Sequence, residues 1–266
     1  MFKQDELILR AYFRLEESRR QRLWMQRVWH PETMDWKKRG GPPPMTETKR
    51  IRQEELARLG FGESHYGAMG EAETAARATL EGLAREHPLW EHFSKLHLFG
   101  PYLCGCFVAA GGDIQRPPTV SAFWRGMGLD LVVVGDVAMA PRRLRANVPV
   151  NKALRDALGD RIIPALPHVT LIGEQIRSQI LRGSGNLYQR YLQFKELEPP
   201  DKIKMFRHKS ALRKTQKVLY ACAWREWRQA YGLPAPDPYA FAILKHGGDG
   251  GPIRFSDLYD TPVPPD

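Results

Sequence analysis

The residues best suited to binding chemistry are cations along one predicted helix, at about residues 206–231. Four of them, Lys209, Arg213, Lys217 and Arg228, form a single stripe together with Trp224. Between residues 200 and 230 the chain holds nine Lys/Arg and two acids, a local charge of +7. Such a stripe matches the phosphates of a nucleic acid and makes binding steeply salt-dependent. A solvated charged face is the alternative, and Trp224 either stacks on a base or packs inward.

Other cations extend this candidate interface. The remaining candidates for contact with nucleic acid are Arg116, Arg142, Arg143, Arg145, Lys152, Arg207 and Lys214. The opposite face of the 206–231 helix is apolar, so we expect it to pack inward: Leu212, Leu219, Cys222, Ala223 and Trp227.

A glycine turn between two predicted helices offers a second kind of contact. In the segment Leu96–Leu129, Gly100 permits close approach of the backbone and Pro101 suits a first helical position. A helix-hairpin-helix unit of this kind directs backbone N–H groups and a helix dipole at a phosphate, without reading base sequence. A plain pair of helices that uses glycine for packing fits the spacing equally well.

Catalytic chemistry has one weak candidate. Ser184 lies in the turn Gly183-Ser184-Gly185, which resembles the setting of a nucleophile but is explained more simply as a polar turn that ends a helix. The eight histidines and three cysteines show no metal-ligand spacing, and no phosphate-binding glycine loop follows a strand. The sequence therefore predicts no metal and no cofactor, and it leaves enzymatic activity open.

The composition favours an anionic partner. The 266 residues carry a formal charge of +10, with a pI of about 9.6, which attracts polyanions. Cys104, Cys106 and Cys222 make no disulfide framework and are interpreted as buried apolar residues of a reducing compartment. No stretch approaches the ~20 apolar residues of a membrane span, and the N-terminus does not resemble a signal peptide. We expect a cytoplasmic, nucleoid-associated protein that does not bind membranes.

Periodicity predicts a mainly α, multi-helix protein that contains a helix-hairpin-helix-like unit. Residues 1–88 form an N-terminal helical region with a Pro/Gly linker at 37–46, and residues 89–246 form a helical nucleic-acid-binding domain. The one clear β-branched run, at 131–134, is followed by Gly135-Asp136 and by Val137-Ala138-Met139, which allows a small β-hairpin. The Gly- and Pro-rich residues 247–266 are predicted to be a flexible tail.

The N-terminal region begins with a long predicted helix at residues 4–30. Its apolar residues, Ile8, Tyr12, Leu15 and Leu23, recur near helical spacing, and arginines occupy much of the remaining surface. The arginines either lie along phosphates or face solvent over a docked apolar stripe. The length of the helix suggests a homodimer through it as a hypothesis. Farther on, four glycines predict a loop at 60–70.

The segment Leu96–Leu129 resembles the C-terminal domain of the DEDD-type insertion-sequence transposases, the IS-one-ten and Piv invertase family. Leu98-Phe99-Gly100-Pro101 falls on that family's GIGP hairpin, and Gly111-Gly112-Asp113-Ile114 on its IGDI element. Downstream, Leu171-Ile172-Gly173-Glu174 looks like its LIGES helix, and the residues from Leu187 to Lys195 look like its tyrosine helix. The resemblance covers about residues 89–246 and implies a helical, DNA-handling domain used in DNA recombination.

The sequence departs from this family where the family carries its catalysis. The RuvC-like nuclease domain, whose four acids hold divalent metal, has no counterpart in residues 1–88. The family also places a nucleophilic serine in the region that corresponds to residues 131–147, which contain none. In the hairpin region, Leu98 replaces the first glycine and Pro117 replaces an aromatic residue.

Three functional hypotheses follow. The first is a DNA-binding protein, with structured RNA as a second ligand, that has an accessory or repurposed role in recombination or transposition. The second is an active transposase or recombinase with an unrecognised nucleophile, completed by a partner chain. The third is a basic structural protein of a nucleoprotein assembly. The sequence does not decide between DNA and RNA.

Overall fold

The protein is mainly α, as the sequence predicts. The computed structural model describes residues 1–29, 54, 57–58, 60, 63–129, 132–134, 137–139, 167–236 and 253–260. Its helices are α1 (Lys3–Trp29), α3 (Glu63–Glu86), α4 (Trp90–Phe93), α5 (Pro101–Gly111), α6 (Val120–Gly126), α8 (Pro167–Arg182), α9 (Asn186–Glu196), α10 (Lys204–Ala230) and the 3-10 helix η5 (Phe255–Leu258). Strands β1 (Val132–Val134) and β2 (Val137–Met139) pair antiparallel, at the place where the sequence predicts a small hairpin.

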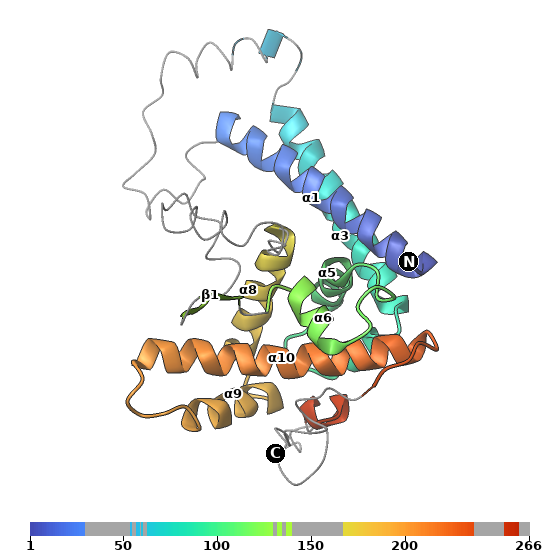
Figure 1. Cartoon of the computed structure of the whole chain (residues 1–266). Helices are drawn as coiled ribbons and strands as arrows, with labels where there is room; N and C mark the ends of the chain where they lie inside the picture. Colours follow the sequence, from blue (N-terminus) through green and yellow to red (C-terminus); the bar gives the residue numbers. More distant parts are fainter. Residues whose placement is uncertain are drawn as a thin grey trace, which may run out of the picture.

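Helices α1 and α3 lie side by side along much of their length (Figure 1). The apolar stripe of α1 is covered within the chain, because Ile8, Tyr12 and Leu15 are at most 1% exposed. The long N-terminal helix that suggests a homodimer therefore already packs against α3. Helix α3 begins at Glu63, so the predicted loop at 60–70 is wrong over most of its length.

Helix α5 is the centre of the core, and small residues let its neighbours approach closely. Each residue from Leu103 to Ala109 is buried. A Cβ atom on Gly105 would lie 2.9 Å from the Leu80 side chain of α3, and one on Gly111 would lie 2.7 Å from the Trp227 ring of α10. Close contacts of this kind require glycine. One hydrophobic cluster spans both sides of the predicted boundary at residue 88, so that boundary does not separate two cores.

The start of α1 and the residue just after α10 meet in a buried polar cluster. Asp5 of α1 accepts a hydrogen bond from Tyr231, just after α10, at 2.8 Å. The Nε2 atom of His87 lies 3.1 Å from the same carboxylate oxygen, and its Nδ1 atom accepts from the Leu89 backbone at 3.1 Å. Because Nδ1 is an acceptor here, Nε2 carries the proton and donates to Asp5.

Residues 253–260 pack against the body, so the predicted flexible tail is wrong for this stretch. Ile253, Phe255 and Leu258 are at most 4% exposed. Burial of three large apolar side chains, together with hydrogen bonds, outweighs the entropy of ordering a short segment. The Asp260 carboxylate accepts hydrogen bonds from the backbone N–H groups of His97 and Asn186.

The three cysteines are buried and unbonded to one another, as their spacing predicts. Burial raises the pKa of the Cys106 and Cys222 thiols to about 12, so both are protonated and unreactive near neutral pH. Among the helices that the structure describes, none has the length and apolar content needed to cross a bilayer.

Candidate nucleic-acid interface

Among the described residues, the strongest concentration of unbalanced charge lies where α9 turns into α10. We call residues 195–217 the basic elbow. It contains eight Lys/Arg and three acids, a net charge of +5. In Figure 1 the elbow lies at the end of α10 that points away from the α1–α3 pair. A protein surface of this charge attracts a polyanion over a Debye length of about 10 Å.

A buried carboxylate holds the elbow in shape. Glu198, 1% exposed, lies 2.6 Å from the Lys214 ammonium and 3.0 Å from that of Lys202, and it accepts from Ser210 at 2.6 Å. Burial alone would raise the pKa of Glu198, but these three donors outweigh it and lower the pKa to about 2. At neutral pH the carboxylate is charged, and the ammonium groups of Lys202 and Lys214 beside it offset that charge.

The cations of the elbow differ in how far they face solvent. Lys204 and Lys209 are exposed, and the side chains of Lys202 and Lys214 are about half exposed, at 49% and 47%. The other three candidates in this half of α10, Arg207, Arg213 and Lys217, are half-buried. The exposed lysines are therefore the best placed to contact phosphates.

The half-buried cations of the elbow also serve packing. Arg207 donates to the carbonyl of Lys195 near the end of α9, at 3.3 Å. Arg213 donates to the carbonyl of Leu129, which precedes the β-hairpin. The Lys217 ammonium lies 4.6 Å from the centre of the Trp124 ring, a cation–π distance. Replacing these residues would disturb the fold together with any binding.

His208 reports the electrostatic field of the elbow. Its Nδ1 atom lies 2.7 Å from the hydroxyl of Tyr191 on α9. Desolvation lowers the pKa of His208 below 6.5, and the charges of Lys195 and Lys209 lower it further. Both of these neighbouring charges are positive, which is consistent with the excess of cations at this surface.

The predicted stripe does not continue beyond Lys217. Trp224 is fully buried, and its Nε1–H donates to the carbonyl of Pro117 at 3.1 Å. Arg228 is 5% exposed and donates to the carbonyls of Ile114 at 2.8 Å and Pro234 at 2.7 Å. Both residues hold loops against α10, so their assignment to a nucleic-acid surface is wrong.

The sequence contains a signal for this burial. From Val218 to Trp224, α10 has seven uninterrupted apolar residues, and a helix that is apolar on every side is buried on every side. The predicted inward face is confirmed, because Leu212, Leu219, Cys222, Ala223 and Trp227 are all buried.

The remaining predicted cations are not gathered at the elbow. Arg116 is 85% exposed and lies 3.5 Å from Asp113, next to the Pro117 carbonyl that binds Trp224. Lys209 and Trp224 are fifteen positions apart on one helix, or about 22 Å, so Arg116 cannot share one compact site with Lys209. The candidates Arg142, Arg143, Arg145 and Lys152 lie outside the described residues.

The glycine turn has the predicted local geometry but an acidic neighbour. Gly100 caps α5 in an extended conformation, and Pro101 occupies the first turn. The preceding helix, α4, has four residues, so a helix-hairpin-helix unit stays a prediction. The backbone N–H of His97, in the segment that leads to Gly100, donates to the Asp260 carboxylate, and a negative charge in this segment disfavours a phosphate contact at the turn.

Ser184 is exposed in the turn between α8 and α9. The neighbouring glycines bring it near two polar residues: a Cβ atom on Gly183 would lie 3.6 Å from the His97 ring, and one on Gly185 would overlap Asp260. Within the described ranges, no hydrogen bond joins Ser184 to a general base, and no three His, Cys, Asp or Glu side chains are grouped to hold a metal ion.

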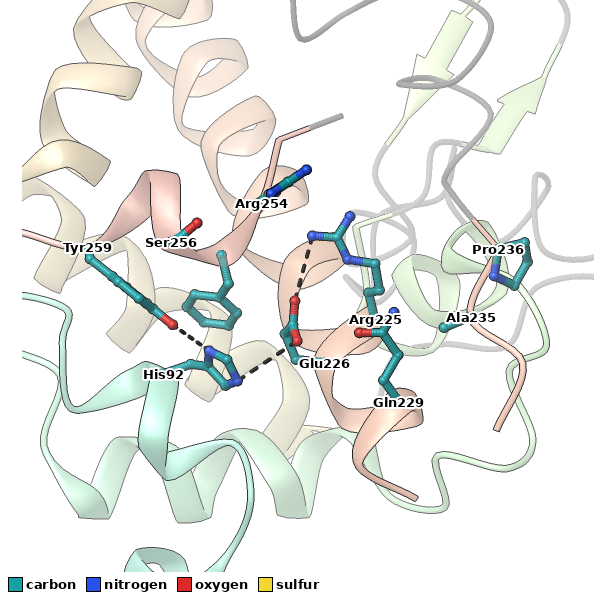
Figure 2. Close-up of a pocket in the computed structure, with 10 residues that line it drawn as sticks. His92, Arg225, Glu226, Gln229, Ala235, Pro236, Arg254, Ser256 and Tyr259 are labelled. Atoms are coloured by element: carbon teal, nitrogen blue, oxygen red, sulfur yellow. Dashed lines mark hydrogen bonds and ion pairs between the residues drawn. The ribbon is translucent and has the colours of Figure 1, made fainter. Parts of the chain in front are cut away.

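An open pocket of about 600 Å³ lies between the last turns of α10 and η5 (Figure 2). His92 Nδ1 lies 2.5 Å from the Tyr259 hydroxyl, and His92 Nε2 lies 3.9 Å from Glu226. Burial lowers the pKa of His92, and the nearby Glu226 and Glu91 oppose this effect only in part. A neutral His92 accepts a hydrogen bond from the hydroxyl of Tyr259 and so joins the segment just after η5 to α4. The contacts among His92, Tyr259 and Glu226 therefore have a structural explanation.

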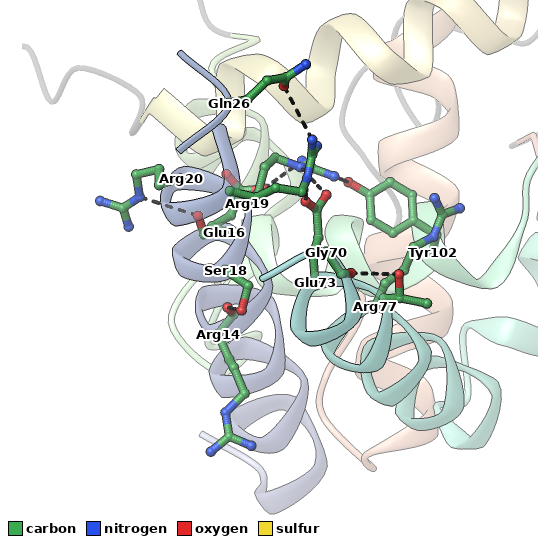
Figure 3. Close-up of polar contacts among 12 residues, drawn as sticks. Arg14, Glu16, Ser18, Arg19, Arg20, Gln26, Gly70, Glu73, Arg77 and Tyr102 are labelled. Atoms are coloured by element: carbon green, nitrogen blue, oxygen red, sulfur yellow. Dashed lines mark hydrogen bonds and ion pairs between the residues drawn. The ribbon is translucent and has the colours of Figure 1, made fainter. Parts of the chain in front are cut away.

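Four arginines of α1 contrast with the exposed lysines of the elbow because each pairs with an acid. Arg19 and Arg22 both bind Glu73 of α3, and Arg19 also contacts Tyr102 (Figure 3). Two exposed arginines pair with acids on their own helix: Arg10 with Glu6 and Arg20 with Glu17. Of the two interpretations of this helix, a solvated face over a docked apolar stripe fits the contacts better.

Sequence reasoning counted Lys202 and Lys204 in the local charge but did not assign them, or the apolar residues beside them, to the candidate interface. Lys202 and Lys204 add to its charge, and Met205 and Phe206 are exposed beside them. The signal is the alternation Lys202-Ile203-Lys204-Met205, in which charged and apolar residues follow each other at a helix start.

Comparisons of the chain with family models, with curated proteins and with solved structures give no match.

Proposed function

We propose that this protein binds nucleic acid through the basic elbow, and that DNA is its natural ligand. The observation that carries the proposal is an imbalance of charge at one rigid surface. Lys204 and Lys209 are exposed to solvent, while the buried acid of the elbow, Glu198, already has three donors. A phosphate backbone supplies the negative charge that this surface lacks.

The resemblance to insertion-sequence transposases is the reason for choosing DNA. Two backbone features support it. Leu98, at the position where the pattern has glycine, has a φ of +65°, a conformation that favours glycine. Gly112, at a glycine of the second element, has φ 64° and ψ −133°, which other residues avoid. We propose an accessory or repurposed role in DNA recombination, which would place the protein on the nucleoid.

The expected mode of binding is contact with the sugar–phosphate backbone. Lysine is a point charge on a flexible stem, so it neutralises a phosphate without reading a base. Each neutralised phosphate releases counterions and steepens the salt dependence of binding. Any preference of the protein for a DNA sequence comes from the shape of the DNA or from protein surfaces outside the elbow.

The test is a pair of double variants with the same net charge. Lys204→Gln/Lys209→Gln removes two charges from the elbow, and Arg10→Gln/Arg20→Gln removes two from the surface of α1. By fluorescence anisotropy in dilute buffer, the elbow variant should bind labelled DNA roughly 10- to 100-fold more weakly, and the α1 variant should bind nearly as the parent does. Equal affinities for the two variants would contradict the proposal.

The other two hypotheses predict different results in the same preparation. An active recombinase nicks supercoiled DNA in the presence of divalent metal, and Ser184→Ala abolishes the nicking if Ser184 is the nucleophile. A structural nucleoprotein binds specific and random DNA alike at physiological salt, whereas an accessory factor retains a preference for its own site.

A further inference from the structure

The tip of the basic elbow exposes large apolar side chains. Leu197, Ile203, Met205 and Phe206 are 75%, 65%, 52% and 46% exposed; we call these four residues the apolar tip. Isolated exposed apolar residues are ordinary, but a group of them within ten positions of the chain marks a binding surface.

The apolar tip is interleaved with cations. Lys202 and Lys204 flank Ile203 in the sequence, and the first turn of α10 contains no acid. The N-terminal end of a helix also carries partial positive charge from its backbone dipoles. A ligand that covers this tip must therefore combine negative charge with flat or apolar groups.

The tip is held in place before any ligand arrives. The Ile203 carbonyl accepts from the backbone N–H groups of Phe206 at 2.8 Å and Arg207 at 3.1 Å, which forms the first turn of α10. Behind the tip, Glu198 binds Lys202 and Lys214 and so joins the turn to the next part of the helix. Such an ordered surface loses little conformational entropy on binding.

We infer that the apolar tip stacks on unpaired bases, so that the elbow prefers a single strand, a loop or a frayed end of nucleic acid over an intact duplex. This inference rests on the proposed function. In a duplex the faces of the bases are stacked and hidden, and Phe206 could contact them only by opening the helix. In a single strand every base offers a face for an aromatic ring while lysines neutralise the phosphates beside it.

The test compares one oligonucleotide as a single strand and as a duplex, with variants of Phe206. The parent should bind the single strand about tenfold more tightly. Phe206→Ala and Phe206→Leu should weaken single-strand binding roughly 5- to 100-fold and leave duplex binding unchanged. Phe206→Trp should keep the parent's affinity for the single strand and for the duplex. Phe13→Ala is the matched control, because Phe13 is 48% exposed on α1. Circular dichroism checks that each variant is folded.

Other outcomes separate this inference from the function on which it rests. If single strand and duplex bind equally and Phe206→Ala changes neither, the inference is overturned but the proposed function stands. If Lys204→Gln/Lys209→Gln also leaves the affinities for the single strand and for the duplex unchanged, the proposed function fails as well. If Phe206→Ala abolishes binding to phosphatidylserine vesicles and leaves nucleic-acid binding intact, the tip is a membrane-surface site and the inference is again overturned.

Discussion

The carboxylate of Glu198 lies 2.6 Å from the ammonium of Lys214, and this contact joins the segment after α9 to the third turn of α10. The carboxylate is 1% exposed, yet the Lys214 side chain is 47% exposed. One buried acid thus anchors lysines whose remaining surface faces solvent, which makes the elbow rigid without removing its excess of positive charge.

Replacing Glu198 should destabilise the protein in a pH-dependent way. The pKa of Glu198 is lowered from 4.5 to about 2, so its stabilising contribution is complete above pH 4.5 and is lost as the pH falls toward 2. Glu198→Gln should lower the free energy of unfolding by about 2 kcal/mol at pH 7 and by less at pH 3, measured by urea denaturation. Glu196→Gln, at an exposed position on the same turn, is the control; equal urea midpoints for the two variants at pH 7 would contradict the prediction.

The imidazole of His208 should respond to ligand binding. Desolvation and the charges of Lys195 and Lys209 lower its pKa, so a polyanion at the elbow should raise that pKa toward 6.5. Lys209→Gln should raise it in the free protein as well, because one of the opposing charges is removed. Titration of the histidine ring signals by NMR, with His208→Gln for assignment, measures both effects; a pKa that is the same with and without DNA would place the ligand elsewhere.

Arg228 should be required for stability. A lysine at this position cannot reach the carbonyls of Ile114, Pro117 and Pro234 together, all three of which accept from the guanidinium. We expect Arg228→Lys to cost about 2 kcal/mol of unfolding free energy, whereas Arg116→Lys on the surface should cost less than about 0.5 kcal/mol. A folded Arg228→Lys protein with normal stability and weakened DNA binding would contradict this prediction and indicate that Arg228 contacts the nucleic acid.

Gly185 should not tolerate a side chain, because a Cβ atom there overlaps the Asp260 carboxylate. Gly185→Ala should destabilise by about 1–3 kcal/mol, and the loss should be less than additive with Asp260→Ala, since that change removes the obstructing group. Gly82→Ala in α3, where nothing lies within 4 Å of the new Cβ, should instead be stabilising by up to about 1 kcal/mol. Additive losses in the double variant would show that Asp260 is not the obstacle.

Local sequence signals predicted the helices well where those signals are strong. Helical periodicity and a Gly/Pro stop predicted α10 to within two residues at its start and one at its end, and Gly183 ends α8 as expected. The start of α3 was missed because Gly67 and Gly70 lower helix propensity, yet both lie inside the helix. Packing against α1, which the local sequence does not contain, overrides that propensity.

The candidate site was only partly predictable, because the fate of a cation depends on distant partners. Lys209 and Arg228 look alike in a charge count, but Arg228 meets carbonyls from two loops more than a hundred residues apart. Docking of residues 253–260 was not foreseen for the same reason, since Phe255 and Leu258 bury against helices far away in the chain. A charge stripe predicts a surface, and only the fold determines where that surface ends.

The most direct test of the account is the slope of log K against log salt concentration for DNA binding by the parent, Lys204→Gln/Lys209→Gln and Arg10→Gln/Arg20→Gln. Each phosphate contact contributes about 0.9 to that slope, so the elbow variant should flatten it by up to about 2 units, while the α1 variant keeps the slope of the parent. Identical slopes for all three proteins, or a flattening confined to the α1 variant, would contradict the assignment of nucleic-acid binding to the basic elbow.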